Sequence, residues 1–477
     1  MLVIISDLHL GDGTTATSIP ASAFYLFAKR LRQDAHFASL SNGAYRPIEE
    51  LDVILLGDIL DPIHSTRWFF QVGDQTFSRI TAPGDADYVR PWSDPNDPKF
   101  AAKLMEITRA ILEKNKEAMD LMRKLASGEF IEFDPAGDRG ERDSASQKKI
   151  PLKVRFHYMV GNHDWYYHLK GEAFDQIRAE IIRTMGLSNP PAPFPFDLRK
   201  VDPNLPWKAD ESPDLERIFH DYKVFARHGD FFDSFNFNRE KGRDTATIGD
   251  AFAMEVINKF PEILHRSPGF GFDPMVVDKL RQITNVRPTL ATPVWINGQI
   301  KTLAMLNKLG TSGENDLKKV WDGLAAEFLD LEFVRQEDKS FKLDLVDKLQ
   351  AAIFFSKLIS FAAIDTLTLR LQASKRSKAE RTFAKYALQE PALLDHKANY
   401  VVYGHTHHHE TIPLDHDAVA GNQIYFNSGT WHTYFDLARK APAERKFIPY
   451  KALTYITFYK PHEHDDRSFE TWSGAYA

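Results

Sequence analysis

Four short apolar segments, each followed by a polar block that contains Asp, Asn or His, constrain this chain more than any other feature. They span residues 2–5, 53–56, 154–160 and 400–403. Apolar runs of this length are typical of strands that are covered on both faces of a sheet. Residues 21–32, between the first two runs, have helical spacing and give a β-α-β start. We therefore predict an α/β fold.

Helix ends and shorter apolar runs indicate further elements. Additional strands are predicted at residues 225–227, 423–426 and 453–458. Asp97 and Pro98 supply an N-cap and a first-turn proline for one long helix, whose apolar stripe runs to a stop at Gly128. A second helix is predicted from Glu172 to a stop at Gly186.

Two segments look like additions to a compact core. Residues 61–150 hold the long helix and end in a very polar loop, whereas residues 232–395 are mostly helical in pattern. We predict a core whose first part is 1–231, with 61–150 inserted in it, and whose last part is 396–477. Residues 232–395 are predicted to form a helical cap or lid between the two parts.

Five polar blocks end or follow the predicted strands. They are Asp7-Leu8-His9, Gly57-Asp58-Ile59-Leu60-Asp61, Gly161-Asn162-His163-Asp164, His228-Gly229-Asp230 and Gly404-His405-Thr406-His407. Carboxylate, imidazole and amide oxygen are ligands for hard or borderline cations. If the chain is extended, a spacing of two residues puts both side chains on one side, and ligands gather at the carboxyl ends of strands in open α/β sheets. The blocks therefore predict a metal site.

In order and internal spacing, these blocks resemble the signature of the calcineurin-like metallophosphoesterases. The resemblance implies a four-layer α-β-β-α sandwich, here with a helical cap insertion, and two adjacent metal ions. The implied ligands are Asp7, His9 and His407 for the first ion, Asn162, His228 and His405 for the second, and a bridging Asp58.

The same resemblance implies the catalytic residues. His163 matches the family's histidine that is not a ligand and acts as general acid, and Asp164 is expected to orient it. Two carboxylates against two divalent ions leave a site of about +2, which attracts a phosphate ester. Ions roughly 3.5–4 Å apart can share a water, lower its pKa so that a bridging hydroxide attacks, and clamp the phosphoryl group. We take manganese as the leading candidate, with iron, zinc, cobalt or nickel as alternatives.

Composition and charge exclude some classes of protein. The formal net charge of −6 argues against a nucleic-acid coat, and the absence of Cys removes disulfides and thiolate sites. No secretory signal is visible, so we expect a soluble, cytoplasmic protein. The apolar stretch 351–371 is interrupted by charges and is a poor spanning helix. We interpret the basic stretch 370–385 as a solvated helix face rather than a lipid contact, so peripheral membrane binding is not favoured.

The predicted function is hydrolysis of phosphate esters by a phosphodiesterase or phosphomonoesterase. One alternative is a lipid pyrophosphatase resembling the UDP-diacylglucosamine hydrolases, which share the Ser-Asp-Leu-His-Leu start at residues 6–10. Another is a non-catalytic binding scaffold on the same fold. The gaps from Asp58 to Asn162 and from His228 to His405 exceed those of compact relatives. Substrate choice is therefore expected to reside in the two insertions, and the sequence does not indicate the oligomeric state.

Overall fold

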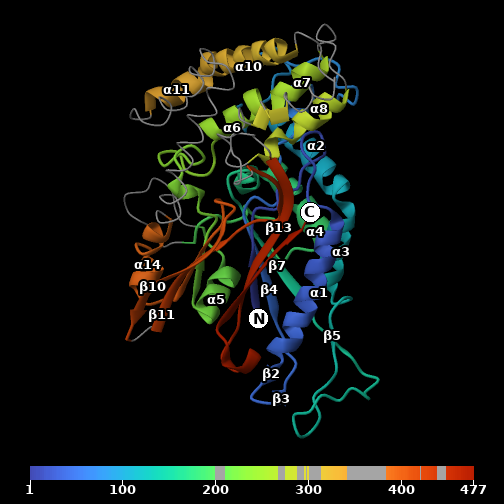
Figure 1. The fold of residues 1–477 in the computed structure, drawn as a ribbon, viewed down its shortest axis with the longest axis vertical. Coiled ribbons are helices and arrows are strands. Elements are labelled where there is room, and N and C mark those ends of the chain that lie inside the picture. The colour runs from blue at the N-terminus through green and yellow to red at the C-terminus, as the bar shows by residue number, and fades with distance from the viewer. Residues whose placement is uncertain are drawn as a thin grey trace.

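The computed structural model describes residues 1–198, 210–266, 274–286, 295–296, 298–299, 313–340, 383–418, 421–437 and 447–476. These residues form a mixed α/β protein, as the sequence predicts, and its strands include two larger β-sheets (Figure 1). The predicted apolar stretch 351–371 and all of the basic stretch up to residue 382 lie outside the described residues. In the part of the chain that is described, no helix is long and apolar enough to cross a membrane.

The strands keep close to the predicted segments, with several additions. Their bounds are β1 (Leu2–Ile5), β2 (Leu40–Ser41), β3 (Ala44–Tyr45), β4 (Leu51–Leu56), β5 (Glu132–Phe133), β6 (Ile150–Pro151), β7 (Val154–Met159), β8 (Val224–Ala226), β9 (Tyr400–Tyr403), β10 (His409–Asp417), β11 (Gly421–Ser428), β12 (His432–Leu437), β13 (Phe447–Phe458) and β14 (Phe469–Tyr476). The larger sheet has the order β12-β13-β1-β4-β7, with β14 paired to β13, and the other has the order β10-β11-β9-β8. Strands β1, β4 and β7 are parallel, as are β8, β9 and β11.

The helices surround the sheets and extend beyond one end of them (Figure 1). Their bounds are α1 (Ala21–Ala38), α2 (Pro98–Lys114), α3 (Lys116–Ser127), α4 (Glu172–Met185), α5 (Pro213–Tyr222), α6 (Ile248–Phe252), α7 (Lys259–Arg266), α8 (Pro274–Arg281), α10 (Gly313–Asp330), α11 (Glu332–Ser340) and α14 (Pro391–Leu394). Asp97 caps α2 by accepting from the Lys99 backbone, with Pro98 in the first turn, as predicted. The single long helix predicted up to Gly128 is wrong: Asn115 separates α2 from α3.

Alternation along β1 explains why its whole sequence is apolar. Val3 and Ile5 pack with α1 to α4 in one cluster, and Leu2 and Ile4 face a second cluster. That second cluster joins the two sheets, because it also contains Val402 of β9, among other residues of the smaller sheet. Figure 1 places β10, β11 and α14 on the opposite side of the central strands from α1 and α3.

The helices α6, α7, α8, α10 and α11 form a region with its own apolar core, which we call the helical region (residues 248–340 as described). It lies at one end of the molecule in Figure 1 and falls within the predicted insertion 232–395. The other insertion docks onto it. The buried Arg90 donates to Glu255 at 3.1 Å and to the carbonyl oxygens of Trp68 and Thr81. The two insertions are therefore connected to each other.

Candidate metal centre

The five polar blocks come together at one edge of the sheets. Each follows a strand, in the order β1, β4, β7, β8 and β9. Because β1, β4 and β7 run parallel, and β8 runs parallel to β9, the carboxyl ends within each set meet at one edge. The structure thus gathers side chains that lie as far apart in sequence as Asp7 and His407.

The backbone conformation of these blocks differs from the extended conformation that we expected from the sequence. We expected extended chain to bring alternate side chains together, but five residues of the blocks have a left-handed backbone. Their φ angles are 54° for Asp7, 46° for His9, 55° for Asp58, 66° for His405 and 61° for His407. Residues other than glycine rarely adopt this conformation, and its presence in several residues of one place marks functional sites.

Glycine permits the strands to approach closely beneath the centre. A Cβ on Gly161 would lie 2.3 Å from the Asp58 carboxylate and 2.7 Å from the His228 ring. A Cβ on Gly57 would lie 2.5 Å from Nδ1 of His228, and its φ is +81°. Because neither glycine has a side chain, Asp58 and His228 can occupy this space.

A first group of side chains consists of Asp7, His9 and His407, whose ligand atoms all lie within 4.8 Å of one another. His407 Nε2 lies 3.1 Å from Asp7 Oδ1 and 3.1 Å from His9 Nε2. Asp7 and His9 are almost fully buried. These are the three residues predicted to hold the first ion.

A second group consists of Asp58, His228 and His405. Asn162 completes it, because its Oδ1 lies 3.2 Å from His228 Nε2 and 3.0 Å from His405 Nδ1. Asp58 Oδ2 lies 3.2 Å from His228 Nε2 and 3.8 Å from His9 Nε2. Asp58 thus stands between the two groups, where the bridging ligand is predicted.

Three of the imidazoles form a hydrogen bond through the ring nitrogen that points away from the centre. His9 Nδ1 bonds to Asp61 at 3.0 Å, His228 Nδ1 to the Leu56 carbonyl at 2.9 Å, and His405 Nε2 to Asp233 at 3.1 Å. Each outer nitrogen must carry the proton, because its partner can only accept. In a neutral imidazole the inner nitrogen then presents a lone pair. This second layer of contacts fixes the tautomer that a metal ligand needs.

The ligand atoms that face the inside of the two groups are arranged in a way that suits a bound cation. Lone pairs of His228 and His405 face the Asn162 oxygen, so acceptors oppose acceptors there. The buried Asp7 Oδ1 lies 3.1 Å from His407 Nε2, which also lies 3.1 Å from His9 Nε2. Buried acceptors that face one another are costly, and divalent ions between these nitrogen and oxygen atoms would satisfy them. Several of the buried His/Asp clusters can hold a metal ion.

The electrostatics of the centre favour positive charge. Burial alone would raise the pKa of Asp7, but the imidazoles of His407 and His228 lower it to about 2. Burial alone would lower the pKa of His228, but Asp58 and Asp7 raise it to about 10. The lowered pKa of Asp7 reports the imidazoles beside it, whereas the raised pKa of His228 reports the negative charge of the carboxylates, and a bound metal ion replaces the protons that such carboxylates attract.

His163 lies beside both groups and is oriented by a residue that we did not predict. Its Nδ1 lies 3.1 Å from Asp61 Oδ1, and its Nε2 lies 4.0 Å from Asp58 Oδ2. Asp61 therefore holds His9 with one oxygen and His163 with the other. The signal was present, because Asp61 closes the block that contains Asp58.

Asp164, which we expected to orient His163, contacts the loops beneath the centre. Its carboxylate accepts from the backbone amides of Ile59 and Gly161 and from the Tyr158 hydroxyl. Burial, with the charge of Asp58 added, raises the pKa of Asp164 to about 7. Asp164 thus ties the loops after β4 and β7 together and supports the centre from below.

Other residues hold the loops of the centre in place. Thr430 Oγ1 and the Trp431 amide donate to the Asp7 carbonyl at 2.7 and 3.1 Å. Asp230 pairs with Arg243 at 2.6 Å, and Arg243 also donates to the Gly161 carbonyl. These contacts, like that of Asp233, join residues far apart in sequence, which no local pattern could indicate.

The remaining histidines divide into structural residues and one neighbour of the centre. His157 pairs with Asp52, and His168 lies between Asp210 and Asp244. His432 lies beside the centre, with its ring centroid 5.3 Å from that of His9.

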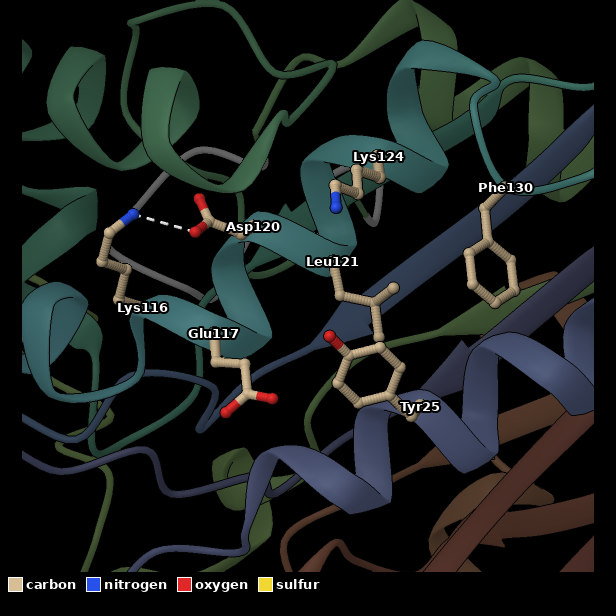
Figure 2. A pocket seen from close by; sticks show the side chains of 7 residues that line it. All are labelled: Tyr25, Lys116, Glu117, Asp120, Leu121, Lys124 and Phe130. Atoms are coloured by element: carbon tan, nitrogen blue, oxygen red, sulfur yellow. Dashed lines mark hydrogen bonds and ion pairs between the residues drawn. The ribbon is translucent and has the colours of Figure 1, made fainter.

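A separate hollow lies away from the centre, between α1 and α3. Its volume is about 410 Å³, and Figure 2 shows Tyr25 of α1 near Leu121 of α3, with Lys116 and Asp120 paired at 2.8 Å. None of its lining residues belongs to the five blocks. The chemistry of the metal centre therefore does not extend to this hollow.

No protein-family model matches this chain, and a search of curated proteins finds no match.

Proposed function

We propose that this protein hydrolyses phosphate esters with two divalent metal ions, as a metallophosphoesterase of the calcineurin-like family. One observation carries the proposal: two groups of inward-facing ligands share Asp58, and their histidines are held from outside by acceptors. When bound, two ions in this arrangement neutralise phosphoryl oxygens and lower the pKa of a water between them.

The packing supports the four-layer sandwich that this family implies. One apolar cluster lies between α1 to α4 and the larger sheet, and a second joins the two sheets. A third packs residues 383–398, which include α14, against the outer face of β9. The helical region would then be the cap insertion.

The chain's own residues supply the rest of the reaction. A P–O bond forms from water and the ester P–O bond breaks, so the departing alkoxide needs a proton. His163 is 17% exposed on its side chain, borders the centre and is held by Asp61, which places it to donate that proton. Monoesters and diesters are both compatible with this arrangement.

The test is a substrate panel in added Mn²⁺ that compares phosphomonoesters, phosphodiesters and pyrophosphate esters, including a lipid-linked one. His163→Ala is expected to keep both ions but to lose most hydrolysis, by about 10²–10⁴-fold. Asp58→Ala is expected to lose at least one ion, measured by elemental analysis. Equal metal loss in both variants would contradict the assigned roles. Bound metal without turnover of any substrate would indicate a binding scaffold instead.

A further inference from the structure

One group of possible metal ligands in the described chain uses none of the residues predicted to bind the two ions. It consists of Asp61, His64 and His163, and their ligand atoms all lie within 4.8 Å of one another. His163 Nδ1 lies 3.1 Å from Asp61 Oδ1, and the His64 backbone amide donates to the same oxygen at 3.1 Å. The centroids of the two imidazole rings are 5.2 Å apart. Two imidazoles and a carboxylate, which all bind divalent cations, therefore meet beside the proposed centre.

A buried amide fixes which nitrogen atom of His64 can bind a cation. Asn258 is fully buried, and its Nδ2 donates to the Ile63 carbonyl at 2.8 Å, which leaves its Oδ1 as the acceptor for His64. His64 Nδ1 lies 2.8 Å from that oxygen and therefore carries the proton. In the neutral ring the lone pair is then on Nε2. Ligand histidines are typically held in this way, through a hydrogen bond on the other ring nitrogen.

This support comes from the helical region, whereas the three ligands come from loops after strands of the core. Asn258 ends the π-helical turn Ala253–Asn258, a rare type of turn that is frequent at functional sites. Asp61 and His64 follow β4, and His163 follows β7. The helical region therefore orients one ligand of the group.

The space beside the group suits a single ion. Asp61 and His64 help to line a crevice with a free volume of about 10 Å³, which is room for about one water molecule. An organic ligand would not fit, but an ion would. His64 and His163 are both half-buried, so a cation can reach the group from solvent.

The chemistry of the three ligands selects the kind of cation. Two imidazoles with one carboxylate favour a borderline cation such as Zn²⁺, whereas Ca²⁺ and Mg²⁺ prefer oxygen ligands. Three protein ligands also leave a fourth position for water. Because two divalent ions in the proposed centre would repel another ion nearby, we expect this cation to bind more weakly than they do.

We propose that Asp61, His64 and His163 form a third cation site, which takes Zn²⁺ and inhibits hydrolysis when it fills. The cation takes the place of the proton that His163 shares with Asp61, and that proton moves to the other ring nitrogen or to solvent. His163 is then a ligand and loses the contact that orients it as proton donor. The third site goes beyond the proposed function, and only the inhibition rests on it.

The first test counts bound ions. The full-length protein is dialysed against increasing Zn²⁺, and the bound metal is measured by elemental analysis. The wild-type protein is expected to bind two equivalents, and a third at a Zn²⁺ concentration about tenfold higher or more, because of the repulsion. His64→Gln is expected to weaken the third equivalent by at least about 100-fold, since loss of an outer contact alone costs 10–100-fold. His220→Gln, at an exposed position on α5, is the matched control and should still bind three.

The second test follows hydrolysis in the same samples. The substrates are glycerol 2-phosphate and bis(glyceryl) phosphate, because their alkoxide leaving groups need a proton. The wild-type rate is expected to fall at least about tenfold as the third equivalent binds, since loss of a proton donor costs 10²–10⁴-fold. The rate of His64→Gln should change less than about twofold over the same Zn²⁺ range. If His64→Gln fails to fold, Asn258→Ala removes only the support and should weaken the third equivalent about 10–100-fold.

The outcomes separate the third site from the proposed function. If neither ester is hydrolysed in Zn²⁺ or in Mn²⁺, the proposed function fails, and the count of ions still decides the third site. Two equivalents at every Zn²⁺ concentration, or a third that binds equally well to His64→Gln, would overturn the third site. A third equivalent that leaves the wild-type rate unchanged would overturn the inhibition.

Discussion

The Asp61 carboxylate shows how a single residue can serve two tasks in this centre. One oxygen accepts from His9, which faces the first group of ligands, and the other accepts from His163, the expected proton donor. Its pKa lies well below the ordinary value, since burial is outweighed by His64 and His163. It therefore stays ionised and can accept from both rings.

Asp61→Asn tests this double role. An amide has only one acceptor oxygen, so one of the two imidazoles loses its partner. We expect metal affinity to fall about 10–100-fold and turnover to fall at least as much, because such outer contacts have effects of this size. Metal titration and steady-state kinetics measure the two effects. The control is Asp97→Asn, which keeps an N-cap of equal quality and should change neither metal affinity nor turnover. Unchanged metal affinity in Asp61→Asn would contradict the role of Asp61 at His9.

Gly161→Ala tests the close approach beneath the centre. The added methyl group would overlap the Asp58 carboxylate and the His228 ring, so both must move. We expect loss of bound metal in a protein that remains folded, as measured by elemental analysis and circular dichroism. Gly323→Ala on α10 meets open space and is expected to stabilise the protein by about 0.5–1 kcal/mol. Full metal content in Gly161→Ala would show that the crowding is harmless.

The candidate ligands could be predicted from the sequence, whereas the residues that support them could not. Asp7, Asp58, Asn162 and the histidines stand in short blocks directly after strands, and parallel strands bring such blocks to one edge. Asp233 reaches His405, and Thr430 reaches Asp7, only through the tertiary fold.

At the scale of elements, continuous runs of apolar residues predicted the buried strands but not the exposed ones. Strands β1 and β9 match their predicted bounds because both faces are covered. Strands β10 and β14 carry many polar residues, and their pairing is set by neighbours rather than by pattern. The break between α2 and α3 has a tertiary cause as well: Asn115 Nδ2 donates to the Gly11 carbonyl at 2.9 Å.

Arg90→Met tests the connection between the two insertions. Arg90 and Glu255 are both buried, and removal of the cation leaves Lys259 as the remaining ion-pair partner of the carboxylate. We expect a loss of about 3 kcal/mol in the free energy of unfolding, measured by urea denaturation, because broken buried pairs cost that much. Arg79→Met removes an exposed pair in the same loop and should leave stability almost unchanged. Equal losses of stability in the two variants would show that the Arg90–Glu255 pair does not hold the two insertions together.

At the scale of the whole molecule, His168 links three segments and makes stability depend on pH. It bonds to Asp210 at 3.0 Å and to Asp244. Burial would lower the pKa of His168, but these two carboxylates raise it above the ordinary 6.5. A raised pKa in the folded state means that the stabilisation is complete below about pH 6.5 and is lost as pH rises through the folded value.

His168→Gln should therefore flatten part of the pH dependence of unfolding. Between pH 6.5 and 9 we expect the free energy of unfolding to fall less for the variant than for the wild-type protein, as measured by urea denaturation at each pH. His220→Gln, at an exposed position on α5, is the control and should follow the wild-type curve. Parallel curves for His168→Gln and wild type would exclude a contribution from this histidine.

The contact of Thr430 and Trp431 with the Asp7 carbonyl has a consequence for how the protein is made. During synthesis the chain emerges from its amino end at about 5–20 residues per second, so Asp7, His9 and Asp58 leave the ribosome long before His405 and His407. Nascent chains up to that point carry the acidic half of the centre without its closing histidines or the turn that steadies Asp7. Under the proposed function, capture of both ions would therefore be confined to the last stage of biogenesis, after nearly the entire polypeptide has been released.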